Sequence, residues 1–110
     1  MKVLVIWKAL VSEVYHKRFK ELARLKDVEL AIIVPAKWQK TRLEKKYCNE
    51  YKIIPRKVIF NGFNHFHWYP GLAKVVRQIR PDIIHIEEEH YSLVTHQAIR
   101  LAKRYNAKCL

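Results

Sequence analysis

The sequence predicts an α/β fold in which a parallel sheet carries helices on both faces. Short apolar runs at Val3–Trp7, Val28–Val34 and Ile83–Ile86 show the continuous hydrophobic pattern of strands that are buried on both sides. Segments with apolar residues at helical spacing separate these runs. Because a strand, helix, strand order closes by a right-handed crossover, we expect the strands to be parallel.

The first two strands enclose a segment with the pattern of an amphipathic helix. Ser12 is a suitable N-cap, and Glu13 stands in the first turn, where a carboxylate complements the helix dipole. Apolar side chains recur at helical spacing from there to Leu25. Pro35 ends the second strand.

The segment 36–57 interrupts this pattern with cations. It holds eight Lys or Arg against two Glu, a net charge of six and therefore half of the chain's +12. It is either a solvated loop with a short helix and a short strand near Tyr51–Ile54, or a surface that meets anions. Val58–Phe60 is a candidate third strand, and Asn61-Gly62 is typical of a turn.

Aromatic and histidine residues then alternate in 63–71. In an extended segment His65 and His67 would share one face, and Phe66 and Trp68 the other. Two histidines without a third ligand nearby do not indicate a metal site. Packing and hydrogen bonding, or contact with a substrate, are the remaining uses of these imidazoles.

The last third of the chain predicts helix, strand and helix. Apolar spacing favours a helix from Leu72 to Ile79, which Pro81 ends. A second helix follows Ser92, with Asn106 as its C-terminal cap. Residues 107–110 have the pattern of another strand, so we expect the chain to be the front part of a longer protein.

Three consecutive carboxylates, Glu87, Glu88 and Glu89, follow the strand Ile83–Ile86. Ligands of open α/β sheets bind outside the carboxyl ends of the strands, so this position indicates a binding crevice. Alternation along a strand would place Glu87 and Glu89 on one side, facing the cleft, and Glu88 opposite. The alternative is that the three glutamates offset the basic surface and cap the next helix.

Composition limits the classes of function. The charge of +12, from 22 Lys and Arg against 10 Asp and Glu, favours anionic partners. Only two glycines are present, which excludes a glycine-rich phosphate loop. The two cysteines have no metal-ligand spacing, so we expect no metal. No run approaches the ~20 apolar residues of a membrane span, which favours a cytoplasmic or peripheral protein.

Several motifs together carry a resemblance to a known family. They are Lys2–Ile6, Val28–Pro35, His65-x-His67-x-Tyr69-Pro70-Gly71-Leu72 and Pro81–Glu89. With them, the chain resembles the amino-terminal, acceptor-side domain of family 4-like glycosyltransferases of the GT-B fold. The resemblance implies that 1–110 is a Rossmann-like domain and the incomplete amino-terminal half of a GT-B fold. This domain would be truncated before its last strands, and the donor-binding domain would be absent from the chain.

The resemblance also implies an activity and partners. The full-length enzyme would be a hexosyltransferase-like glycosyltransferase that moves a sugar from a nucleotide-sugar donor to a hydroxyl acceptor, and this fragment alone would be inactive. The second domain would bind most of the donor. The acceptor would be a sugar or lipid-linked molecule, with the enzyme peripheral on the inner face of the cell membrane. Neither a cofactor nor nucleic acid is expected.

Site residues follow from the same resemblance and from position at the strand ends. Glu87 and Glu89 are the candidate catalytic groups. The candidate acceptor-binding residues are Lys8, Ser12, His65, His67, Tyr69, Glu88 and His90. His90 stands where relatives often have proline, and the loop Trp7–Val11 lacks the glycine-rich turn common in the family.

Two other classes of function compete with this one. A small basic α/β module that binds nucleic acid or another polyanion would use the cations of 36–57 and stack bases on Trp38, Trp68 and Tyr69. A freestanding flavodoxin-like regulatory domain would need acidic residues at several strand ends. The sequence has one acidic cluster.

Overall fold

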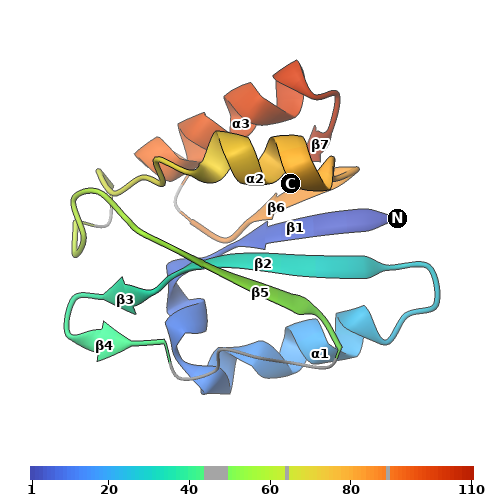
Figure 1. The fold of residues 1–110 in the computed structure, drawn as a ribbon, viewed down its shortest axis with the longest axis horizontal. Helices are drawn as coiled ribbons and strands as arrows, with labels where there is room; N and C mark the ends of the chain where they lie inside the picture. Colours follow the sequence, from blue (N-terminus) through green and yellow to red (C-terminus); the bar gives the residue numbers. More distant parts are fainter. Residues whose placement is uncertain (44–49, 64, 89) are drawn as a thin grey trace.

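The computed structural model describes residues 1–43, 50–63, 65–88 and 90–110, and it has the expected α/β, Rossmann-like fold. Five parallel strands form the sheet in the order β5-β2-β1-β6-β7 (Figure 1). Their bounds are β1 (Lys2–Ile6), β2 (Glu29–Pro35), β5 (Lys52–Arg56), β6 (Ile83–Ile86) and β7 (Lys108–Cys109). A short antiparallel hairpin, β3 (Lys37–Trp38) and β4 (Thr41–Arg42), follows β2.

Helices cover both faces of the sheet, as the sequence predicts (Figure 1). α1 (Lys17–Ala23) lies on one face, where Phe19 packs with Val3, Val5 and Ile32 of the strands. α2 (Leu72–Ile79) and α3 (Leu93–Arg104) lie on the other. Alternate strand residues therefore enter two separate cores. The second core contains Leu4, Ile6, Ile33, Ile84, Leu72, Val75, Val94 and Ala98.

The strand order creates a reversal in the centre of the sheet. From β1 the chain moves outward to β2 and β5, then returns to place β6 on the other side of β1. β1 and β6 pair from Val3↔Ile83 to Ile6↔Ile86, so both strands end at the same level. In open α/β sheets such a reversal leaves a crevice at the carboxyl ends of the two strands.

The first helix is shorter than expected. Instead of one helix from Ser12, the chain forms 3-10 turns at Lys8–Val11 and Glu13–His16 before α1 begins. The Ser12 side chain makes no capping hydrogen bond. His16 is buried, and its Nε2 lies 2.7 Å from the Leu10 carbonyl oxygen. This contact joins the first 3-10 turn to the second, so the chain enters α1 through two short turns and not through one continuous helix.

The third strand also differs in part from the sequence prediction. β5 covers Lys52–Arg56, overlapping the strand expected near Tyr51–Ile54. Val58–Phe60 is not a strand: Ile59 forms a single antiparallel bridge with Trp68, and Phe60 has φ of 56°. A positive φ cannot continue an extended chain. The helix expected between 36 and 51 falls partly on 44–49, outside the described residues.

The remaining elements agree with the sequence. α2 ends where Arg80 takes a left-handed conformation (φ 54°) ahead of Pro81, and Asn106 does the same after α3 (φ 58°). β7 lies within the strand expected at 107–110. None of the helices in the described part of the chain has the length and apolar character needed to cross a membrane.

Candidate functional site

The loops after β1 and β6 bring Lys8 and Glu88 together at the central reversal of the sheet. Lys8 Nζ lies 2.6 Å from Glu88 Oε1, and the Lys8 backbone N–H donates to Glu88 Oε2 at 2.9 Å. The Glu88 side chain has no exposed surface, and that of Lys8 is 18% exposed. Eighty positions separate the two residues, so the parallel register of β1 and β6 brings them together.

Aromatic side chains enclose this ion pair. His67 is fully buried, with Nε2 3.6 Å from Glu88 Oε2. Its Nδ1 lies 3.2 Å from the Phe63 carbonyl oxygen, which can only accept, so Nδ1 carries a proton. The Trp38 ring packs edge-on against His67, with centroids 4.8 Å apart, and lies 5.8 Å from Lys8 Nζ. Trp38 and Lys8 thus form the outer cover of the buried carboxylate.

Tyr69, which lies three residues before the start of α2, completes the cluster. Its backbone is held by Gln97 of α3, which accepts from the Tyr69 N–H at 3.1 Å and donates to the Tyr69 carbonyl at 2.6 Å. The Tyr69 ring lies 6.3 Å from that of His67 and has no exposed surface. Its hydroxyl has no hydrogen-bond partner among the residues that the structure describes. A buried hydroxyl of this kind calls for a water or a ligand.

The charges of the cluster fix its protonation. Burial alone would raise the pKa of Glu88, but the polar contact with His67, the hydrogen bonds from Lys8 and the Lys8 charge outweigh it, so the pKa is lowered. Burial, and next the negative charge of Glu88, raise the pKa of Tyr69 well above its usual value of 10.0. At neutral pH the cluster therefore holds a carboxylate acceptor beside a neutral hydroxyl donor.

Glu87 lies on the opposite face of the sheet, as strand alternation predicts for neighbours. Its Oε1 lies 2.6 Å from Arg18 Nη2 on α1 and 2.7 Å from His85 Nε2. The Glu87 side chain is 27% exposed. The cluster with Lys8, His67 and Tyr69 is therefore built on Glu88, and the expectation that Glu87 faces the cleft with Glu88 opposite is wrong. Glu89, expected to face the cleft with Glu87, lies outside the described residues.

The other expected site residues do not join this cluster. His65 is exposed and packs beside the Tyr91 ring, with centroids 4.7 Å apart. His90 is also exposed, and its ring packs at nearly a right angle to the Tyr91 ring. His65 and His67 do not share a face, because successive turns from Phe60 to Phe66 replace the extended segment that alternation requires. Ser12 is half-buried in the loop between the two 3-10 turns.

Trp38 is the member of the cluster that the sequence does not place there. Its only sequence signal is an aromatic residue between Lys37 and Lys40, just past the end of β2, which fits base stacking as well as packing. Within the described ranges, no group of three His, Cys, Asp or Glu residues is arranged to hold a metal ion.

Comparisons of the chain with protein-family models, with curated proteins and with solved structures give no match. The glycosyltransferase resemblance therefore depends on the motifs of the sequence itself.

Proposed function

We propose that the chain is the acceptor-side domain of a glycosyltransferase, and that the cluster around Glu88 binds hydroxyl groups of the acceptor. The observation that carries this proposal is the position of Lys8 and Glu88 at the carboxyl ends of β1 and β6. These strands flank the reversal of strand order, where α/β sheets bind ligands. The motifs shared with GT-B enzymes favour a sugar as that ligand.

The chemistry of the cluster suits sugar hydroxyls. The lowered pKa keeps Glu88 ionised, so its oxygens accept hydrogen bonds from hydroxyl groups. The Tyr69 hydroxyl is available to donate one. Trp38 offers a flat apolar surface for the C–H face of a sugar ring. Because Lys8 covers the carboxylate, an acceptor would bind by displacing the Lys8 ammonium from Glu88.

The lowered pKa also separates the proposed roles of the glutamates. A carboxylate whose proton is weakly held is a poor general base, so Glu88 acts in binding. The resemblance offers Glu87 and Glu89 for the reacting step, but Glu87 lies on the face opposite the cluster, so we do not assign it to an acceptor that binds at Glu88. The nucleotide-sugar donor would come from a second domain, and the whole enzyme would be cytoplasmic.

Binding can be tested by NMR titration of the ¹⁵N-labelled chain with neutral sugars and nucleotide sugars. We expect shifts at the Lys8 and His67 amides and at the Trp38 indole. Glu88→Gln should weaken binding about tenfold, the loss expected when a hydrogen bond to a charged group is removed. Glu87→Gln is the matched control on the opposite face and should change affinity less than twofold.

Two results would count against the proposal. One is that no sugar shifts these signals while both variants keep the native spectrum. The other is that Glu87→Gln and Glu88→Gln weaken binding equally, which would place the ligand elsewhere. Turnover is measured separately, as nucleotide-sugar hydrolysis by a protein that includes the proposed donor-binding domain, where Glu89→Gln should reduce the rate and Glu87→Gln should leave it unchanged.

A further inference from the structure

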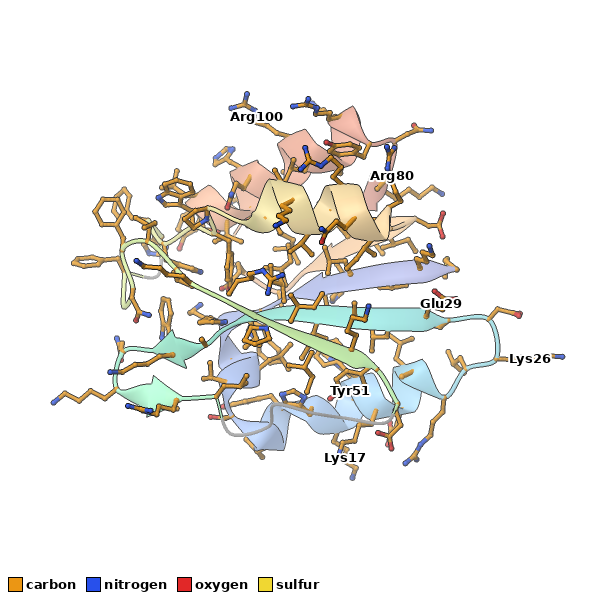
Figure 2. The ribbon with its side chains drawn as sticks, in the orientation of Figure 1. Lys17, Lys26, Glu29, Tyr51, Arg80 and Arg100 are labelled. Atoms are coloured by element: carbon orange, nitrogen blue, oxygen red, sulfur yellow. The ribbon has the colours of Figure 1, made fainter. Side chains whose placement is uncertain are left out.

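The chain between Ile59 and Trp68 presents phenylalanine side chains to solvent, and we call its described residues, 59–63 and 65–68, the aromatic loop. Its base is closed by two backbone hydrogen bonds between Ile59 and Trp68, of 2.9 and 3.2 Å. Phe60, Phe63 and Phe66 are 59%, 60% and 60% exposed. Sticks of this region project from the carboxyl edge of the sheet in Figure 2. Exposed apolar side chains that gather in one place mark an interaction surface.

The local backbone holds these rings outward. The Phe63 N–H donates to the Phe60 carbonyl at 3.1 Å, and the Phe66 N–H to the Phe63 carbonyl at 3.2 Å, so each turn begins or ends at a phenylalanine. Phe60 has φ of 56°, an unfavourable conformation for a bulky residue. Strain of this kind persists where the surrounding structure enforces it, often at a binding surface.

The β3–β4 hairpin anchors the aromatic loop. Asn61 Nδ2 donates to the Lys37 carbonyl, and Asn61 Oδ1 accepts from the Gln39 N–H, both at 2.5 Å. On the other side, the Leu93 N–H donates to the His65 carbonyl at 2.9 Å, which joins the loop to the start of α3. Leu93 is 40% exposed and so extends the apolar surface.

The segments that form this surface and its neighbourhood contain cations and no acidic residue. Segments 36–43, 57–69 and 90–104 contain no Asp or Glu. Their seven Lys and Arg residues are Lys37, Lys40, Arg42, Lys57, Arg100, Lys103 and Arg104, all exposed. Arg100 and Arg104 line a groove of about 570 Å³ with the apolar side chains of Trp68, Leu93 and Leu101. The groove therefore places two cations beside apolar side chains, and Trp68 and Leu93 connect it to the aromatic loop.

We propose that the aromatic loop and the groove along α3 dock onto an anionic lipid bilayer. The three phenyl rings enter the headgroup boundary, and the surrounding Lys and Arg side chains meet lipid phosphates. A bilayer fits better than a nucleic acid, because the Phe60 and Phe63 rings stand at 84° and offer no parallel platform for successive bases. Binding to the bilayer would depend on the exposed phenyl rings and on the cations, and it does not require sugar transfer.

Co-sedimentation with vesicles tests the proposal. The chain should pellet with vesicles of phosphatidylcholine and phosphatidylglycerol and stay in solution with phosphatidylcholine alone. Replacing Phe60, Phe63 and Phe66 together by Ser should lower the partition coefficient at least about tenfold. The control replaces Val14 and Leu25, which are 76% and 57% exposed on other segments, by Ser and should leave it unchanged.

Charge is tested with a pair of variants of equal net charge. Arg100→Gln with Arg104→Gln should lower partition about tenfold. Lys17→Gln with Lys26→Gln removes the same charge from α1 and the turn that follows it (Figure 2) and should have a much smaller effect. Circular dichroism verifies that each variant is folded.

Insertion itself is read from a Phe63→Trp variant. Its added emission should shift to the blue on anionic vesicles and be quenched by lipids with brominated acyl chains. Three outcomes would overturn the proposal: no binding to anionic vesicles, binding that the triple Ser variant retains, or no quenching of the new tryptophan. Phe-dependent binding of single-stranded oligonucleotides, with vesicle binding absent, would identify a nucleic-acid surface instead.

Discussion

Glu88 shows how far a single residue's role depends on tertiary contacts. The sequence places three glutamates at the end of a strand, and alternation correctly puts Glu87 and Glu88 on opposite faces. It does not reveal that Lys8, 80 positions away, pairs with the Glu88 carboxylate, or that His67 and Trp38 pack beside that pair. Such contacts follow from strand order, which local pattern does not encode. The sequence could therefore offer Glu88 as a candidate binding residue but could not predict the buried ion pair that it forms.

The buried ion pair predicts a pH-dependent stability. Because the pKa of Glu88 is lowered by folding, its stabilisation is full above the unfolded-state pKa of about 4.3 and is lost as pH falls through the folded-state pKa. Glu88→Gln should cost about 3 kcal/mol at pH 7, since it leaves Lys8 without its partner. The urea midpoints of wild type and variant should converge only once the pH is below the folded-state pKa of Glu88.

The exposed Glu21→Gln variant is the control and should follow wild type at both pH values. A difference between wild type and Glu88→Gln that persists undiminished at acid pH would show that the loss comes from packing rather than from charge.

At the scale of elements, interior strands were predictable and the edge strand was less so. β1, β2 and β6 have continuous apolar runs because both their faces are covered. β5 contains Pro55, which is tolerated because β5 is an edge strand and pairs only with β2. That proline weakens the strand signal and made Val58–Phe60 an alternative candidate. The start of the first helix was mispredicted: Ser12 makes no capping hydrogen bond, and the chain forms 3-10 turns up to His16.

Capping distinguishes the two helix starts that carry serine. The Ser92 hydroxyl, fully buried, accepts from the Thr95 N–H at 3.2 Å at the start of α3. Ser12 precedes a 3-10 turn and makes no such bond. Ser92→Ala should therefore lower the free energy of unfolding by about 1 kcal/mol. Ser12→Ala should change it by less than about 0.5 kcal/mol, and urea unfolding measures both. Equal losses in the two variants would rule out capping as the cause.

At the scale of the whole molecule, the features on which both proposals depend lie at one edge of the sheet. The ion pair of Lys8 and Glu88, the β3–β4 hairpin and the aromatic loop all lie at the carboxyl ends of the strands (Figure 1). The parallel direction of the strands was predictable from the apolar runs and the helices between them. The central position of β1 was not, because it depends on β6 returning to the side opposite β2.

The net charge predicts how salt acts on the entire fold. Folding confines +12 within a radius of gyration of 12.9 Å, whereas the unfolded chain spreads the same charges apart. Salt screens this repulsion, so the free energy of unfolding should rise by on the order of 1 kcal/mol between 0.01 and 0.15 M NaCl, where the Debye length falls from about 30 to 8 Å. Urea midpoints at the two concentrations measure the change.

The same experiment separates general repulsion from local attraction. Lys17→Gln with Lys26→Gln lowers the net charge from +12 to +10, and both side chains are exposed. If repulsion dominates, this variant should be more stable than wild type at low salt and should gain less from added salt. If ion pairs such as Arg18 with Glu87 dominate instead, salt should destabilise wild type, because exposed pairs weaken as they are screened. The sign of the salt dependence thus decides whether the basic surface of this domain lowers the free energy of unfolding. A destabilising basic surface is what we expect if its charges serve to bind an anionic partner.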